Sequence, residues 1–393
     1  MGTRWFWSAL ALLVCVGVLV AEQGSRAAGQ APQRPAGPRS RPGDGRAPEF
    51  PEPTITEYKP RTTLKTATRL VPRAKFPVID IHSHQPTPIS EAQFATVVAG
   101  MDAVNLRVLV NASGASGARL AQSVAALKAS RFKGRMVQFA EVDFRNVGPG
   151  WGAKAAAQLE VDVKAGALGL GEISKALGLR YRKADGSRLR VDDPELDPVW
   201  ATCGRLGIPV LIHTAEPQEF FETIDVQNER WLELALYRDR RYPAGEFPRF
   251  EELMAERNRM FKKHPKTTFI AAHFAYHAND LARMATLFDE NPNVYTEVGA
   301  ILAELGRQPR AAREFFVKYQ DRIIFGKDSF QPDEFPYYWR VFETGDEYFD
   351  YYRDYHAFWK LYGMSLPDDV LKKLYFKNAL RLVPGLPQEG WPQ

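Results

Sequence analysis

The segment FPVIDIHSH, residues 76–84, combines the two features that decide the fold: a short apolar run and polar residues directly after it. The run Val78–His82 is nearly continuous in apolar residues, as in parallel strands that helices cover. Similar runs recur at Leu106–Asn111, Met136–Val142, Ala167–Ile173, Pro209–His213, Thr268–His273, Val294–Val298 and Arg322–Gly326. Patterns with helical spacing separate these runs, so the sequence predicts eight parallel strands that alternate with helices.

Helix signals between the runs support this alternation. Ser90 and Gln93 form a capping box, Asn279 is predicted to cap a helix over Asp280–Asp289, and Gln308–Gln320 has Ala and aromatic residues at helical spacing. Eight strand–helix units in roughly 310 residues match a (β/α)8 barrel of the TIM type, whose usual size is about 250 residues plus insertions. An open doubly wound sheet is the alternative α/β fold.

The composition excludes several classes of protein. The 393 residues are 45% hydrophobic and 25% charged, as in a globular chain with a sizeable core. The net charge of +5 comes from the N-terminal part. Residues 1–75 hold 12 Lys and Arg against 5 Asp and Glu, and the other residues hold 40 against 42. The folded part therefore lacks the basic surface of a nucleic-acid-binding protein, and no nucleic-acid partner is expected.

The N-terminus has the pattern of an export signal over residues 1–28. Arg4 precedes the apolar run Ala9–Val20, and small residues follow it. An uncleaved anchor is the rival interpretation, although the run is short for a membrane span. Residues 29–61 are rich in Pro and Gly and predict a disordered linker, and residues 62–388 form the predicted barrel domain. We expect a periplasmic or secreted protein with no integral membrane domain after cleavage. After cleavage Cys203 is the remaining cysteine, so no intrachain disulfide is expected.

Two insertions interrupt the strand–helix pattern. Leu179–Val191 alternates on both sides of Asp185-Gly186, which predicts a hairpin. Phe335–Tyr362 contains 13 aromatic residues. These aromatic side chains either pack the core or an oligomer interface, or form a lid over a substrate, since loops after barrel strands build sites.

Side chains that bind metals lie at the ends of the predicted strands. His82, His84, His213 and His273 end strands one, five and six, Glu172 ends strand four in GEIS, and Asp328 follows strand eight in FGKD. Parallel barrel strands all end at one face, so these side chains should converge. Imidazoles with a carboxylate suit Zn²⁺ or a similar ion, which lowers the pKa of a bound water. A neighbouring carboxylate can then accept the proton of that water.

These motifs together resemble the amidohydrolase superfamily. More narrowly, they resemble the amidohydrolase-related branch with aminocarboxymuconate-semialdehyde decarboxylase, resorcylate decarboxylases and sugar or dicarboxylate lactonases. The resemblance covers Phe76 to about Leu382, which ends the NALRL stretch. It implies that His82, His84, His213 and Asp328 bind the metal. It also implies that His273 contacts the metal-bound water or the substrate carbonyl.

The resemblance leaves the number of ions open. In TatD-type nucleases a glutamate placed like Glu172 bridges two metals, and in other subgroups a carboxylated lysine does so, for which Lys175 is close enough. Mononuclear members need neither, and Glu172 could equally support a ligand or bind substrate. One divalent ion is expected, possibly a second. Phe274-Ala275 after His273 replaces a more usual Gly-rich pair, which puts the local backbone geometry in doubt.

The remaining polar candidates have a functional and a structural interpretation. Lys175, Arg307, Arg310 and His277 are candidates for substrate binding, and the paired donors of an arginine suit a carboxylate. The structural interpretation places Arg307 and Arg310 at an exposed helix start and His277 on the surface. His264 is expected to face solvent, Asp80 to support the first strand's turn, and His356 is unassigned.

The sequence therefore predicts an exported metal-dependent hydrolase. Activated water would attack an ester, lactone or amide of a small substrate that bears a carboxylate or hydroxyl group. Asp328 would move the proton, and His273 would stabilise the oxyanion. A nonoxidative decarboxylase with the same ligands is the first alternative, and a tethered binding protein without turnover is the second. A homodimer is suggested by the habit of the family.

Overall fold

The computed structural model describes residues 53–356 and 358–392. The predicted export signal and residues 29–52 of the predicted linker lie outside the described residues. Residues from Ile55 onward form one compact unit. Within the described part of the chain, no helix is long and apolar enough to cross a membrane.

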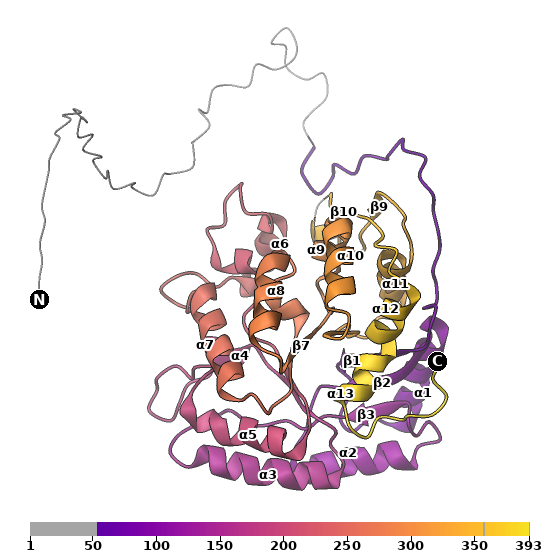
Figure 1. Cartoon of the computed structure of the whole chain (residues 1–393). Coiled ribbons are helices and arrows are strands. Elements are labelled where there is room, and N and C mark those ends of the chain that lie inside the picture. Colours follow the sequence, from indigo (N-terminus) through magenta and orange to yellow (C-terminus); the bar gives the residue numbers. More distant parts are fainter. Residues whose placement is uncertain (1–52, 357, 393) are drawn as a thin grey trace, which may run out of the picture. The chain divides into compact units, whose positions relative to one another are not determined.

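Eight parallel strands form the centre of this unit, at the eight places that the sequence predicts (Figure 1). The strands are β1 Val78–Ser83, β2 Leu106–Asn111, β3 Met136–Gln138, β4 Leu170–Ile173, β5 Val210–Ile212, β6 Phe269–Ala271, β7 Val294–Glu297 and β8 Ile323–Ile324. They are buried almost throughout, which explains their continuous apolar character.

The strands close into a barrel. Pairing runs from β1 to β3 and from β4 to β8, and two isolated parallel bridges, Ser83↔Asp328 and Ala140↔Leu170, join these two groups. Backbone hydrogen bonds continue across both joins, from Ile81 to the Phe325 carbonyl at 3.1 Å and from Leu168 to the Gln138 carbonyl at 3.0 Å. The (β/α)8 barrel is therefore confirmed, and the open doubly wound sheet is wrong.

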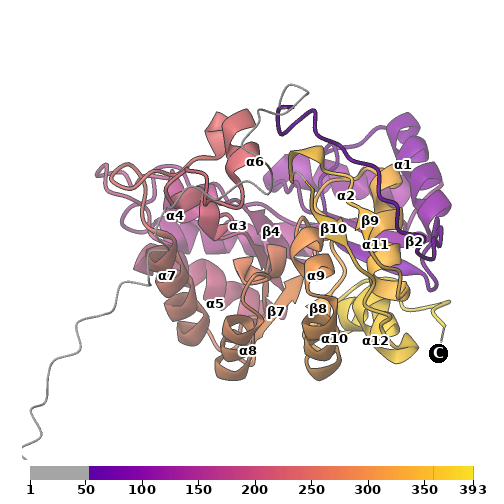
Figure 2. The ribbon, with the colours of Figure 1, turned by 90° about the horizontal axis from the view of Figure 1, so that it is seen from above.

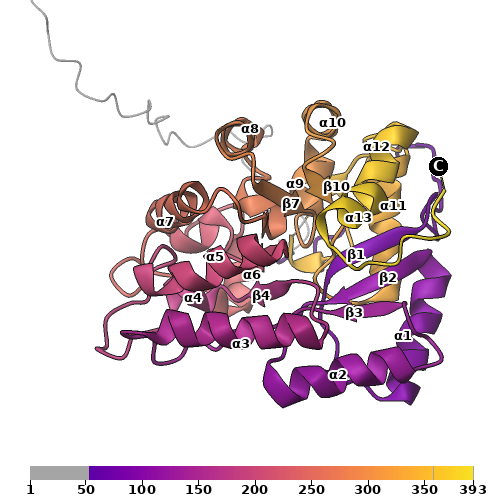
Figure 3. The same cartoon turned by 60° about the horizontal axis from the view of Figure 1, so that its bottom comes forward.

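Helices surround the barrel, as the end-on views show (Figures 2 and 3). The outer helices are α1 Glu91–Val104, α2 Gly117–Ala129, α3 Trp151–Ala165, α5 Asp197–Leu206, α7 Phe250–Lys263, α8 Leu281–Glu290, α10 Pro309–Lys318, α12 Asp368–Lys372, the π-helical turn η7 Lys373–Lys377 and α13 Asn378–Leu382. The capping box of Ser90 and Gln93 is confirmed. The cap of α8 is Asp280, whose side chain accepts from the Arg283 N–H, so the prediction of Asn279 was wrong by one residue.

Shorter elements follow the carboxyl ends of the strands. They are α4 Ala176–Leu179, α6 Trp231–Leu236, α9 Leu302–Arg307, α11 Phe335–Glu343, β9 Phe349–Asp350 and β10 Lys360–Leu361. Several of them, α6, α9, β9 and β10, gather at the top of Figure 1. The predicted hairpin over Leu179–Val191 is present, because Leu189 donates to the Tyr181 carbonyl and Lys183 to the Ser187 carbonyl.

The aromatic insertion mainly packs the core. Phe335, Tyr338, Trp339 and Phe342 of α11 are fully buried, and the rings of Trp339 and Phe325 at the end of β8 are 5.0 Å apart. Burial of such rings contributes strongly to stability. This helix is thus part of the folded core.

We predict that Phe342→Ala lowers the free energy of unfolding by about 3–5 kcal/mol, because it leaves a cavity in the core. Phe358→Ala is the matched control in the same insertion, since Phe358 is 43% exposed. The control should change stability by less than about 0.5 kcal/mol. Denaturant titration measures both, and equal small effects would contradict core packing.

Candidate metal centre

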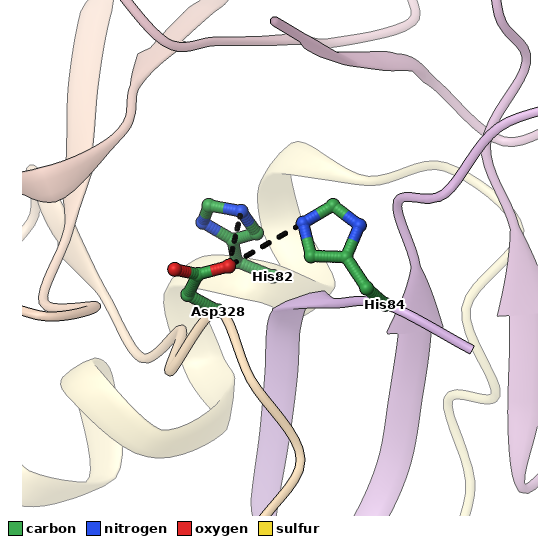
Figure 4. A group of neighbouring side chains, drawn as sticks. All are labelled: His82, His84 and Asp328. Atoms are coloured by element: carbon green, nitrogen blue, oxygen red, sulfur yellow. Dashed lines mark ion pairs between the residues drawn. The ribbon is translucent and has the colours of Figure 1, made fainter. Parts of the chain in front are cut away.

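His82 near the end of β1 and His84 directly after it lie beside Asp328 at the end of the barrel (Figure 4). The Nε2 atoms of His82 and His84 are 3.7 and 3.4 Å from Oδ1 of Asp328. Asp80 holds the two strand ends together, because its Oδ1 accepts from the backbone N–H groups of His82 and Lys327, each at 3.1 Å. The expected support of the turn by Asp80 is therefore present.

Glu172 lies between all four predicted histidines. Its Oε2 is 3.4 Å from His82 Nε2 and 3.2 Å from His84 Nε2. Its Oε1 is 2.7 Å from His213 Nδ1 and 3.7 Å from His273 Nε2. The structure therefore brings together all six side chains that the sequence placed at strand ends. Two groups of three, His82–His84–Asp328 and His82–Glu172–His273, each have ligand atoms within 4.8 Å of one another.

Glu297 on β7 orients two of these histidines. Its Oε1 is 3.2 Å from His82 Nδ1 and accepts the backbone N–H of His273 at 2.6 Å. Nδ1 of His273 is 2.9 Å from the carbonyl of Gly299 and donates to it. With Nδ1–H used in this way, Nε2 of each imidazole carries its lone pair toward the centre. The sequence analysis missed Glu297, although it too ends a predicted strand.

A hydrogen-bonded chain orients the third histidine. The Tyr276 hydroxyl is 2.8 Å from Glu216 Oε2, to which it donates, and 2.8 Å from His213 Nε2. His213 therefore donates through Nε2–H, and its Nδ1 is the ring nitrogen that faces Glu172, at 2.7 Å from Oε1. Lys175 forms an ion pair with Glu216, so the structure places Lys175 at the outer end of this chain. Tyr276 and Glu216 are further residues that the sequence analysis missed.

These lone pairs make the centre fit a divalent cation. Nε2 of His82 is buried without a hydrogen-bond partner in the described part of the chain, and such an unpaired buried group costs about 1–3 kcal/mol. Glu172 and Asp328 lie near this atom, His84 lies near the same two carboxylates, and His213 Nδ1 and His273 Nε2 are close to Glu172. Imidazole and carboxylate ligands are those that Zn²⁺ prefers.

The pKa values show that the centre attracts positive charge. Burial alone would lower the pKa of His84, but hydrogen bonds to Asp328 and Glu172 raise it to about 9. Burial also opposes ionisation of His213, yet the charge of Glu172 raises its pKa to about 9. The pKa of Asp328 lies below its usual range, because His84 and the other imidazoles outweigh its burial. Protons and a metal ion therefore compete for the same positions.

The backbone after His273 forms a left-handed turn. His273, Phe274, Ala275 and Tyr276 have φ values of 55°, 55°, 54° and 53°, a conformation that costs roughly 1–2 kcal/mol per residue. The turn brings His273 and Tyr276 side by side, with ring centroids 5.4 Å apart. Arg257 stabilises it, because its buried guanidinium donates to the Ala275 carbonyl at 2.8 Å.

Two of the other histidines differ from expectation. His277 is buried, and its Nε2 is 3.2 Å from Nη2 of Arg257. It is not part of the cavity lining, so both its predicted exposure and its proposed substrate contact are wrong. His264 is also largely covered, because it bonds Asp197 at 2.8 Å. Both histidines pair with polar groups of neighbouring elements that are distant in sequence.

A cavity of about 200 Å³ opens beside the centre. His213, His273 and Asp328 line it together with Lys175 and Arg307. Arg310 is exposed near the start of α10 and outside this lining, as its structural interpretation expected. From the aromatic insertion, Arg353 and Tyr355 reach the cavity. The previously unassigned His356 is buried against Arg230 and Glu233.

The fold is a (β/α)8 barrel, and the carboxyl ends of its strands carry a cluster of histidines and carboxylates that could hold a metal ion. A family model described as amidohydrolase matches residues 72–385. The chain therefore belongs to the amidohydrolase family, as its resemblance implied. Because this superfamily includes hydrolases and decarboxylases, the membership supports an enzyme.

Several solved structures are similar to this chain. An uncharacterized TIM-barrel protein from Bordetella bronchiseptica is 15% identical, with 78% of this chain and 97% of that chain covered and a TM-score of 0.46. The 5-carboxyvanillate decarboxylase from Sphingomonas paucimobilis is 14% identical, with 79% of this chain and 99% of that chain covered and a TM-score of 0.46. A zinc-bound amidohydrolase from Burkholderia multivorans is 14% identical, with 78% of this chain and 100% of that chain covered and a TM-score of 0.40. A search of curated proteins gave no match.

We predict that Glu297→Gln weakens zinc binding about 10- to 100-fold, because the carboxylate no longer orients His82 and His273. Competition with a chromogenic chelator measures the affinity. Glu256→Gln is the matched control, since Glu256 on α7 is also buried but pairs with Arg188 of the hairpin, away from the centre. Unchanged affinity in Glu297→Gln would contradict this role of Glu297.

A second prediction concerns acid stability. Burial, with the charge of Arg257, lowers the pKa of His277 to about 2. Below pH 6.5 His277 is protonated in the unfolded chain but stays neutral in the folded protein. The free energy of unfolding should therefore fall by up to about 1.4 kcal/mol per pH unit from this group. His277→Gln should remove this contribution. At pH 7.5 the variant should have a lower free energy of unfolding than the parent protein, and this difference should be smaller at pH 4.5. Denaturant titrations at the two pH values measure it. A constant difference would contradict the prediction.

Proposed function

We propose that this protein is a metal-dependent hydrolase that cleaves an ester, lactone or amide of a small substrate. The observation that carries the proposal is the unpartnered Nε2 of His82, which faces two carboxylates beside the cavity. A centre of this kind is suited to a divalent cation, for which we propose Zn²⁺, as one ion or two.

Five side chains would hold the metal in this proposal: His82, His84, Asp328 and His213 as ligands, with Glu172 as a further carboxylate ligand. His273 would lie next to the ion. When bound, the ion lowers the pKa of water and polarises a carbonyl group. The ion pair of Lys175 with Glu216 holds its amine as a cation, which argues against Lys175 as a carboxylated ligand.

The protein's own groups would move the proton. Asp328 lies between the β1 histidines and the cavity, and its side chain is 37% exposed. It would accept a proton from the attacking water and deliver it to the leaving group. His273 already donates Nδ1–H to Gly299, so it would stabilise an oxyanion through Nε2–H only in its protonated form.

Our proposals for cellular location and oligomeric state are based on the sequence pattern of residues 1–28 and on the habit of the family. We propose export to the periplasm or the exterior, with the barrel tethered or released according to cleavage of that segment. We also propose a homodimer and a small-molecule substrate. Amino-terminal sequencing of the protein from a secreting host tests export and cleavage. Light scattering on the purified protein tests the homodimer.

We predict that Asp328→Asn lowers kcat about 10²- to 10⁴-fold on the best substrate from a panel of esters, lactones and amides. Elemental analysis of the variant separates loss of metal from loss of proton transfer. Undiminished turnover would contradict the mechanism.

Reactions in ¹⁸O-labelled water distinguish the alternatives. Hydrolysis incorporates one ¹⁸O into the product, whereas nonoxidative decarboxylation releases CO₂ without it. The decarboxylase would use the same ligands. A protein that binds no metal and turns over nothing would support the tethered binding protein instead.

A further inference from the structure

The cations that line the cavity differ in whether a carboxylate neutralises them. Four are paired: Lys175 with Glu216, Arg230 with Glu233 and Glu304, Arg240 with Glu233, and Arg307 with Glu229. The fifth, Arg353, has no ion pair or side-chain hydrogen bond to any of residues 53–356 and 358–392. Its guanidinium is partly buried, and a charge removed from water is costly unless it is paired.

The surroundings of Arg353 do not supply the missing negative charge. The strongest electrostatic partners of its guanidinium are phenols, those of Tyr351, Tyr352, Tyr355 and Tyr338, and phenols are neutral at pH 7. The ring of Tyr352 is 5.6 Å from the guanidinium carbon. The hydroxyls of Tyr351 and Tyr352 are buried without a hydrogen-bond partner in the described part of the chain. The surroundings of Arg353 are therefore rich in donors, and no carboxylate of the described residues lies within ion-pair distance of it.

The backbone fixes Arg353 in this place. It lies between β9 and a short 3-10 turn, Asp354–His356, and its carbonyl accepts the His356 N–H at 3.2 Å. The side chain of His356 is in turn held by Arg230 and Glu233. The insertion thus presents one free guanidinium to the same cavity that His213, His273 and Asp328 line.

We infer that Arg353 binds a carboxylate of the substrate while the metal centre acts on the bond to be cleaved. The planar fork of an arginine binds a carboxylate through two parallel hydrogen bonds. This inference rests on the proposed function and narrows it to carboxylate-bearing esters, lactones or amides. Arg307, predicted from the sequence for this task, is already paired with Glu229 and is therefore not the binding group.

Binding of paired probes tests the inference. The probes are the unbranched diacids from malonate to adipate and their monoamides, titrated calorimetrically into the full-length, zinc-loaded protein. One carboxylate of a diacid can contact the metal and the other Arg353. We expect at least one diacid to bind about 10- to 100-fold more tightly than its monoamide, as is typical of hydrogen bonds to charged groups.

Substitutions then assign this preference to one side chain. Arg353→Gln should remove the preference for the diacid. Arg307→Gln, the matched control at a paired arginine of the same cavity, should retain it. Arg353→Met replaces the glutamine variant if thermal unfolding shows that the latter does not fold. A preference that persists without Arg353, or the absence of any preference in the parent protein, would overturn the inference.

The outcome separates this inference from the proposed hydrolase. An Arg353-dependent preference without turnover would contradict the hydrolase and leave the carboxylate site in place. Hydrolysis without that preference would contradict only the role of Arg353.

Discussion

The site depends on hydrogen bonds that turn imidazole lone pairs inward. His82 uses Nδ1–H toward Glu297, His273 uses Nδ1–H toward Gly299, and His213 uses Nε2–H toward Tyr276. The remaining nitrogen of each ring then faces Glu172. Lone pairs and carboxylate oxygens repel one another unless a proton or a metal ion lies between them. These nitrogen and oxygen atoms can therefore face one another only when protons or a metal ion occupy the positions between them.

The barrel supplies this arrangement through its backbone. His82 and His84 lie on one side of β1 because strand side chains alternate, and the bridge Ser83↔Asp328 brings the end of the chain's last barrel strand beside its first. The Asp328 N–H donates to the His82 carbonyl at 2.7 Å. The left-handed turn after β6 then places Tyr276 within reach of His213. Its strain is opposed by the buried Arg257, which is itself far from the metal ligands in sequence.

Much of the site was predictable because position along a strand is a local property. All eight strands were predicted, and the six strand-end side chains from His82 to Asp328 do meet. Glu297 was missed although the same rule applies to it. The errors at Asn279, His264 and His277 have a different cause. Exposure of a polar residue depends on which neighbour covers it, and Asp197 and Arg257 are not identifiable as those neighbours from local sequence.

The sequence by itself determined the barrel, the family and the residues that converge, since apolar runs and the shared direction of parallel strands need no knowledge of contacts. The tertiary structure alone decided which imidazole nitrogen faces the centre and which cation stays unpaired. Glu229, Glu233 and Glu304 neutralise Arg307, Arg240 and Arg230, whereas Arg353 has phenols around it and no ion pair within the described residues. Pairing of charges is set by distances through space between residues far apart in the chain, and those distances exist only once the chain has folded.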